Sequence, residues 1–253
     1  YTTAHTLSLH DALPISSCFD GGIYSVPKTR WKKPVMLAEH QNYASGVNWS
    51  PAARHLISAG YDGRLLWTNP DEEKITREVK AHDFWSWQSA ISPDGTRIAS
   101  STGQYLCGGY KYEPAPEKEP SVKVFEVHTG KQTHAFEHVP PVESVAFSNN
   151  GKFLAAGNLM GEVRVWDLTT NMEAARIKTA NFTGWGIIKG HYFTGGVFAL
   201  AFSPDDSEIF LAGMGSTRDP AAGNGKQLWE RWKWQEGKVE QDRKSTRLNS
   251  SHQ

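Results

Sequence analysis

The sequence predicts an all-β fold built from repeated units of short antiparallel strands, and three observations lead to this prediction. The 253-residue chain contains 23 Gly, 13 Pro and 10 Trp, a composition typical of many short strands joined by turns. Apolar residues alternate with a period of two, as where Val163 and Val165 alternate with Glu162 and Arg164. One pattern, an alternating run that ends in Ser and is followed by a turn and a second apolar run, occurs four times.

Charge and cysteine content exclude several classes of protein. The chain has 27 Lys and Arg against 27 Asp and Glu, so it lacks the basic excess typical of nucleic-acid binding. Its two cysteines, Cys18 and Cys107, are too few for a disulfide framework or a zinc ribbon. No apolar run reaches the length of about 18 residues that would span a membrane. We therefore expect no nucleic-acid partner, no membrane, no metal and no other cofactor.

The four copies of the repeat are regularly placed along the chain. They span residues 47–60, 89–101, 145–157 and 200–213. Their anchoring serines, Ser50, Ser92, Ser148 and Ser203, are 42, 56 and 55 residues apart. A spacing of about 42 residues is that of one four-stranded propeller blade, and surface insertions account for the longer spacings. Third strands are expected over 121–127 and 161–168, and fourth strands over 75–80, 132–137 and 173–179.

One repeat carries a family signature. The segment VESVAFSNNGKFLAAGNLMGEVRVWDL, residues 142–168, ends in the dipeptide Trp166-Asp167. With its three phased neighbours, it resembles the WD40-repeat β-propeller family. The position of Trp166 is assigned to Trp67, Phe125 and Trp232 in the other repeats, and to Val26 in the segment that precedes them.

The resemblance also implies a role for a polar set in the first repeat. His40, Ser58, Asp62 and Trp67 would form a buried hydrogen-bond network that fixes one blade. Ser, His and Asp also make up hydrolytic triads, so a catalytic role is the alternative. No glycine-flanked nucleophile elbow surrounds Ser58, which favours the structural role.

Both ends of the chain resemble translated sequencing adapters. The stretches HTLSLHDALPI (5–15) and DRKSTRLNSSH (242–252) carry this resemblance. We therefore expect adapter-derived tails over 1–16 and 242–253, and a propeller segment over 17–241. Residues 20–40 would supply two strands, and the last repeat would lack its final strand. That makes about four to five blades of a ring that usually has about seven, so the chain is expected to be a fragment. A cytoplasmic location is favoured, although a natural N-terminus beyond the chain would hide any signal peptide.

Four elaborated connections are expected to meet on one face of the propeller. The insertions 104–120 and 215–226 lie between second and third strands, and the connectors 83–87 and 181–196 join successive repeats. They carry the candidate partner-binding residues, of which Tyr, Trp and Arg are the types enriched at interface hot spots: Phe84, Trp85, Trp87, Tyr105, Tyr110, Tyr112, Trp185, His191, Tyr192, Phe193, Arg218 and Asp219. The alternative is that these aromatic side chains only pack the loops against each other.

The sequence thus predicts a non-enzymatic scaffold for protein–protein interaction, which binds a protein or peptide through this loop face. The alternative is a propeller that is itself an enzyme, lactonase-like or redox, or that is attached to a catalytic domain outside the chain. An enzymatic propeller needs inward-facing His, Arg and carboxylate side chains. The strands expected nearest the channel instead carry Ala90, Ala146 and Ala201, so no catalytic residue is assigned.

Overall fold

The computed structural model describes residues 14–26, 33–103, 105–108, 111–114, 118–178, 183–187, 191–215 and 227–240. For 105–108, 111–114, 183–187, 191–195 and 238–240 only the backbone is described. The expected adapter-derived tails therefore lie outside the described residues, except for residues 14–16. No helix occurs among the described residues, and none that could cross a membrane.

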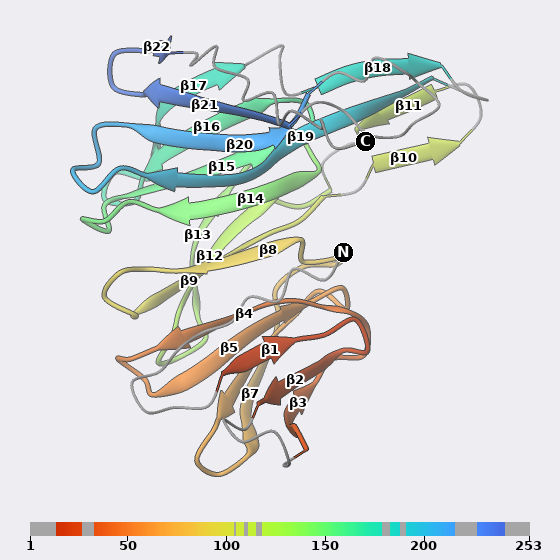
Figure 1. Cartoon of the computed structure of the whole chain (residues 1–253). Coiled ribbons are helices and arrows are strands. Elements are labelled where there is room, and N and C mark those ends of the chain that lie inside the picture. Colours follow the sequence, from red (N-terminus) through yellow and green to blue (C-terminus); the bar gives the residue numbers. More distant parts are fainter. Residues whose placement is uncertain are drawn as a thin grey trace, which may run out of the picture.

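The described strands form five antiparallel sheets of three to five strands, which follow one another along the chain, and one separate two-stranded hairpin. We call the five larger sheets the first to fifth blades (Figure 1). The first blade has strands β1 (Ile15–Ser17), β2 (Gly22–Ser25) and β3 (Val35–Glu39). The second has β4 (Ala44–Ser50), β5 (His55–Gly60), β6 (Arg64–Asn69) and β7 (Lys74–Lys80). The third has β8 (Gln88–Ile91), β9 (Arg97–Ser101), β12 (Val122–Glu126) and β13 (Gln132–Phe136), with the hairpin β10 (Tyr105–Gly108) and β11 (Lys111–Pro114) inserted after β9.

The last two blades continue this order. The fourth blade has β14 (Val142–Phe147), β15 (Phe153–Asn158), β16 (Glu162–Asp167) and β17 (Met172–Lys178). The fifth has β19 (His191–Phe202), β20 (Ile209–Met214), β21 (Gln227–Lys233) and β22 (Lys238–Glu240), and the added strand β18 (Thr183–Ile187) pairs with the beginning of β19. The four repeats seen in the sequence are the first and second strands of the second to fifth blades, so the all-β fold class and the repeat phase are confirmed.

The two ends contain more strand than the sequence predicted. The first blade has three strands instead of two, because Ile15 and Ser16 pair with Ser25 and Tyr24. These two residues fall inside the segment 1–16 that was expected to be a tail. The fifth blade keeps a short fourth strand, since Trp232 pairs with Val239 of β22. The prediction that the last repeat lacks its final strand is therefore wrong.

The recurring serine closes the turn between the first and second strands. In the third blade, the Ser92 hydroxyl donates to Asp94 at 2.5 Å and accepts from the Arg97 backbone N–H at 2.9 Å. Gly95 completes this turn with a φ of +71°, a conformation that glycine adopts without strain. Ser148 makes the equivalent bonds to Asn150 and Phe153. Ser203 repeats these bonds with Asp205 and Glu208, whereas Ser50 accepts from the Ala53 backbone N–H and donates to the Gly95 carbonyl of the next blade. The Ser-turn pattern of the third to fifth blades is thus a local hydrogen-bond requirement.

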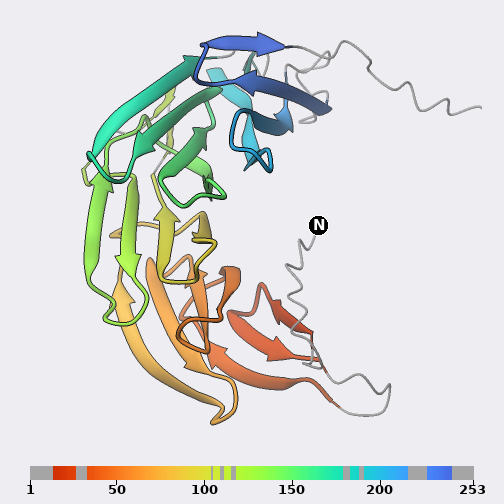
Figure 2. The ribbon, with the colours of Figure 1, turned by 90° about the vertical axis from the view of Figure 1, so that its left-hand side faces the viewer.

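The blades are arranged side by side as an open arc (Figure 2). The first strands of neighbouring blades, β4, β8, β14 and β19, contact one another. They line the inner side of the arc, and the fourth strands β7, β13 and β17 lie on its outer side. The free flank of the fifth blade exposes large apolar side chains, since Phe210 and Trp229 are 41% and 46% exposed. The ring is not closed.

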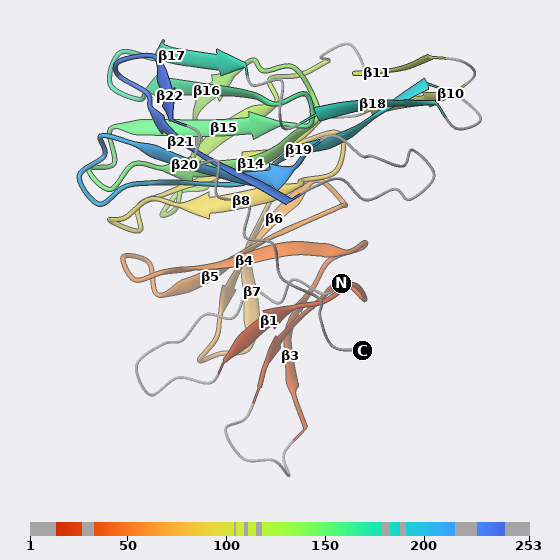
Figure 3. The same cartoon turned by 45° about the horizontal axis from the view of Figure 1, so that its top comes forward.

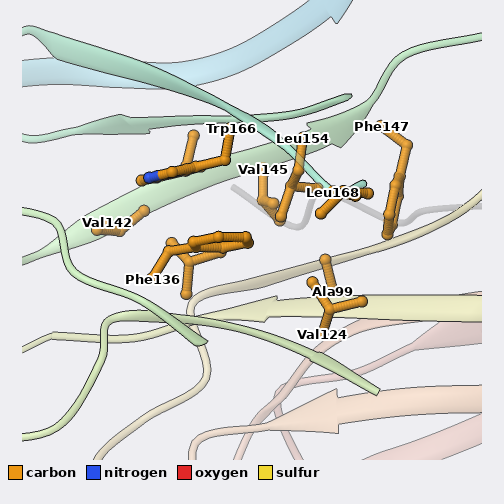
Figure 4. Packing of buried hydrophobic residues seen from close by; sticks show 11 residues of the cluster. Ala99, Val124, Phe136, Val142, Val145, Phe147, Leu154, Trp166 and Leu168 are labelled. Atoms are coloured by element: carbon orange, nitrogen blue, oxygen red, sulfur yellow. The ribbon is translucent and has the colours of Figure 1, made fainter. Parts of the chain in front are cut away.

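Apolar clusters join each pair of neighbouring blades. Between the third and fourth blades, the cluster contains Ala99, Val124, Phe136, Val142, Val145, Phe147, Leu154, Trp166 and Leu168 (Figure 4). Trp166 stacks on Phe136 with ring centroids 4.8 Å apart. Side-chain alternation gives each sheet two such faces: Leu154 packs toward the third blade, and the adjacent Ala155 packs toward the fifth.

Trp67 does not occupy the position of Trp166, contrary to the sequence prediction. The strand register pairs Leu154 with Trp166 and Leu56 with Thr68, so Thr68 holds the equivalent position. Trp67 comes one residue earlier in its strand, and successive side chains of a strand point to opposite faces. It therefore packs toward the following blade, whereas Trp166 packs toward the preceding one.

We predict that Trp166→Ala lowers the free energy of unfolding by about 3–5 kcal/mol, because it leaves a cavity between two blades. Trp166 is only 4% exposed. The matched control is Trp229→Ala on the free flank, expected to change stability by no more than about 0.5 kcal/mol. Denaturant unfolding followed by circular dichroism measures both. Equal stability of Trp166→Ala and the unaltered chain would contradict the packing described here.

Candidate partner-binding face

His40, Ser58 and Asp62 form a hydrogen-bond network between the first and second blades. His40 Nε2 lies 2.9 Å from Ser58 Oγ, and His40 Nδ1 lies 3.1 Å from both Asp62 carboxylate oxygens. The backbone N–H groups of Gln41 and Arg64 also donate to Asp62. Burial tends to raise the pKa of Asp62, but these bonds outweigh it and lower the pKa below its usual value. The network fixes the strand connection after β3 against the β5–β6 turn.

Trp67 is not bonded to this network. Its indole N–H donates instead to the Val127 carbonyl at 2.8 Å, in the next blade. Asp167 likewise has a separate task at the end of β16, where its carboxylate accepts from the backbone N–H groups of Thr169 and Thr170. The first of these bonds is the main cause of the lowered pKa of Asp167. With the stacking of Trp166 on Phe136, the residues assigned to the WD-type network therefore make four separate sets of contacts.

A second network of the same kind occurs one blade further on, and the sequence analysis missed it. His82 Nε2 lies 3.0 Å from Ser100 Oγ, and its Nδ1 lies 3.7 Å from Glu119 Oε2, beyond hydrogen-bond length. Burial tends to raise the pKa of Glu119, but interactions with His82 and Lys123 outweigh it and lower the pKa to about 2. Burial lowers the pKa of His82.

The position of Glu119 explains why this second network was missed. It comes after the β10–β11 insertion, so 19 residues separate it from Ser100, against four between Ser58 and Asp62. The spacing between the acid and the third strand of the blade would have identified Glu119. Glu119 precedes Phe125 by six residues, as Asp62 precedes Thr68.

In the fourth blade the set of histidine, serine and acid is incomplete. His138 Nε2 lies 3.2 Å from the Ala156 carbonyl, because Ala156 occupies the position of the serine. Met160 stands at the position of the acid, and two residues earlier the Asn158 side-chain oxygen accepts from the backbone N–H groups of Met160 and Glu162. Burial and the nearby Arg164 lower the pKa of His138 to about 3.

The catalytic alternative for Ser58 has two observations against it. Ser58 is 1% exposed, so a substrate has no access to its hydroxyl. A matching His–Ser pair with an acid nearby stands at the equivalent place in the next blade, as expected of a repeated structural element. Among the described residues, no group of three side chains is placed to hold a metal ion.

Of the four connections predicted to share one face, the described parts of the insertion 104–120 and of the connector 181–196 lie together, whereas 216–226 lies outside the described residues. The β10–β11 hairpin, β18 and the beginning of β19 gather at one end of the sheets (Figures 1 and 3), and β11 contacts β19. Tyr105, Tyr112, Trp185, His191, Tyr192 and Phe193 lie on these strands, where only the backbone is described. Tyr110, Arg218 and Asp219 lie outside the described residues.

Phe84, Trp85 and Trp87 lie in the connection between β7 and β8. The rings of Trp85 and Trp87 contact Tyr61, and ring contacts continue from Tyr61 to Tyr43 and from Tyr43 to Phe19. We call this set the aromatic cluster: Phe19, Tyr43, Tyr61, Phe84, Trp85 and Trp87. Tyr61 and Trp85 stack with ring centroids 4.7 Å apart and planes within 6°. Phe19, Tyr43 and Trp85 are 54%, 47% and 36% exposed. The cluster therefore presents aromatic surface to solvent as well as packing the loops together.

Sequence reasoning missed Phe19, Tyr43 and Tyr61 because their connections are short. Phe19 lies between β1 and β2, Tyr61 between β5 and β6, and Tyr43 between β3 and β4. These are the same two connection classes that carry the long insertions. A search for aromatic residues in both connection classes, whatever the length of the connection, would have identified all three.

We predict that Ser58→Ala lowers the free energy of unfolding by about 1–3 kcal/mol, because it leaves His40 Nε2 buried without a partner. Any activity or partner binding of the protein should be unchanged, and Ser100→Ala should behave alike as the matched variant in the third blade. Thermal unfolding and a binding assay measure the two effects. Complete loss of an activity at full stability would instead support the triad.

Comparison with known proteins matches the blade order described above. A family model for "WD domain, G-beta repeat" matches residues 31–67, 130–167 and 185–217. The first two matches begin near the last strand of one blade and end with the third strand of the next. The third blade, which carries the β10–β11 insertion, lies largely between the matched segments.

Three similar proteins come from flowering plants. The chain is 22% identical over 179 residues to the guanine nucleotide-binding protein subunit beta of Oryza sativa subsp. japonica, covering 70% of this chain and 43% of the relative. The subunits beta of Arabidopsis thaliana and Nicotiana tabacum are 24% and 23% identical over 179 and 184 residues, or 70% and 72% of this chain. The aligned part covers 43% and 45% of those two relatives, so the chain spans less than half the length of the curated relatives it matches. The chain thus carries WD40 repeats, and its five blades form an open arc consistent with an incomplete WD40 β-propeller.

Proposed function

We propose that this protein is a non-enzymatic scaffold that binds another protein through the face bearing the aromatic cluster. The observation that carries the proposal is the partial exposure of stacked aromatic rings on a rigid support. Tyr43 and Trp85 remain 47% and 36% exposed although each contacts neighbouring rings. Tyr and Trp rings held in place lose little side-chain entropy on binding, which is why they often anchor interfaces.

The support beneath the cluster is stiff. Thr102 Oγ1 donates to the Trp85 carbonyl at 2.7 Å, and the Trp87 indole N–H donates to the Gly103 carbonyl at 2.7 Å. A partner that docks here would therefore meet a surface that is already ordered, which reduces the entropic cost of binding.

The relatives support the same class of function. Their names describe subunits of a guanine nucleotide-binding protein, so those proteins assemble with other polypeptides. Neither these relatives nor the buried Ser58 support the enzymatic alternative.

The test combines site-specific cross-linking with substitution. A photoreactive phenylalanine in place of Tyr43 should capture a discrete protein partner, and the same group in place of Ile75 on the outer strand should not. Ile75 is similarly exposed, at 38%. The double variant Tyr61→Ala, Trp85→Ala should then weaken binding of that partner by about thirtyfold, the effect of losing about 2 kcal/mol at a hot spot. Capture from position 75 only, or unchanged affinity of the double variant at full stability, would contradict the proposal.

A further inference from the structure

A pocket opens beside the aromatic cluster on the inner side of the arc. Its volume is about 460 Å³. The first strands of the second to fifth blades contribute Ser45, Gln88, Glu143 and Phe198, and the cluster contributes Phe19, Tyr43, Tyr61 and Trp87. Lys, Arg and His are absent from the described residues that line it; its other titratable groups are Cys18, Tyr43 and Tyr61.

Two polar atoms of the pocket residues are buried without a hydrogen-bond partner. Among the described residues, Glu143 Oε2 and Ser45 Oγ have neither a donor nor an acceptor in reach. The backbone of Gly196 lies against Glu143 Oε2 so closely that a Cβ there would clash with it. Buried polar groups are almost always paired in folded proteins. An unpaired carboxylate in a pocket is thus a feature that a ligand would complete.

Burial raises the pKa of Glu143 to about 8. Burial and the nearby Glu143 carboxylate also raise the pKa of Tyr61, so the phenol stays neutral near neutral pH. The pocket therefore holds one carboxylate with no positive charge to balance it. A cation that enters would displace the proton of Glu143 and form the missing ion pair.

The rings around the carboxylate add a second attraction for a cation. Phe19, Tyr43, Tyr61 and Trp87 line the pocket, and aromatic faces attract ammonium and guanidinium groups through their quadrupoles. A guanidinium group is planar, stacks on rings and is more weakly hydrated than an ammonium group. Its several N–H donors also suit a site with two unpaired acceptors, Glu143 Oε2 and Ser45 Oγ.

We propose that this pocket binds the guanidinium group of an arginine side chain supplied by the partner protein. The proposal rests on the proposed function, because the pocket adjoins the face on which that partner docks. In the complex, the carboxylate of Glu143 accepts hydrogen bonds from the guanidinium, the Ser45 hydroxyl accepts a further one, and the rings cover its faces.

The unliganded protein carries a measurable sign of the buried acid. The folded-state pKa of Glu143 lies above the ordinary value of 4.5, so the neutral acid stabilises the fold at low pH. This stabilisation is lost as the pH rises from about 4.5 to about 8. We predict that Glu143→Gln matches the unaltered chain in melting temperature at pH 5 and exceeds it at pH 8. The control Glu72→Gln, at an exposed turn, should show no such divergence.

Binding is tested with N-acetyl-arginine amide, the corresponding lysine derivative and the citrulline derivative, which has the shape of arginine without its charge. The fluorescence of Trp87, with Trp85 and its neighbours as a common background, reports occupancy. We expect the arginine derivative to bind at least tenfold more tightly than the other two, and more tightly at pH 8 than at pH 6. Glu143→Gln should remove this preference, and Glu72→Gln should keep it.

Several outcomes would overturn the proposal. Equal binding of arginine and citrulline derivatives, or an unchanged preference in Glu143→Gln, would show that the carboxylate is not the recognition group. Equal binding of the lysine derivative would overturn the assignment to arginine. If Tyr61→Ala, Trp85→Ala weakens the captured partner and Glu143→Gln does not, the docking face stands and the pocket proposal fails. If the probe binds as expected but no partner is captured at position 43, the docking face fails instead.

Discussion

Burial of each sheet on both faces is the constraint on which the rest of the structure depends. A strand alternates its side chains, so adjacent residues of one strand serve different blade interfaces: Leu154 faces the third blade and Ala155 the fifth. No blade therefore has a core of its own. The position of every loop follows from the contact between neighbours, and the exposed Phe210 and Trp229 show the surface that a blade presents where such a contact is missing.

The two ends of the sheets have different tasks. At one end, the turns between first and second strands bond from blade to blade: Ser50 donates to the Gly95 carbonyl, Arg97 to the Gly151 carbonyl, and Asn149 to Asp206. This chain of bonds fixes the spacing of the blades. The opposite end is where the insertions and the aromatic cluster lie, so its connections can vary without disturbing the turns that hold the arc together.

The sequence pattern correctly predicted the features that depend on contacts within one sheet. The Ser-turn and the alternation of apolar residues located the strands of the repeats, because both reflect contacts within one sheet. Trp67 was misplaced because a shift of one residue reverses the face of a side chain, and only the pairing of Leu56 with Thr68 reveals that shift. Glu119 was missed because its partner His82 lies across an insertion. The pocket could not be predicted, since Glu143 and Tyr43 meet through the packing of separate blades.

Glu143 and the aromatic cluster both lower the stability of the free protein. An unpaired buried carboxylate and exposed rings both cost the free protein stability, the first through lost hydration and the second through apolar surface left in water. The neighbouring blades of the arc supply the packing that tolerates this cost, because Val142 and Val145, on the same strand as Glu143, are fully or almost fully buried. A partner that covers the rings and supplies a cation relieves both costs in one event. Part of the binding energy at this face would thus come from relieving these two costs.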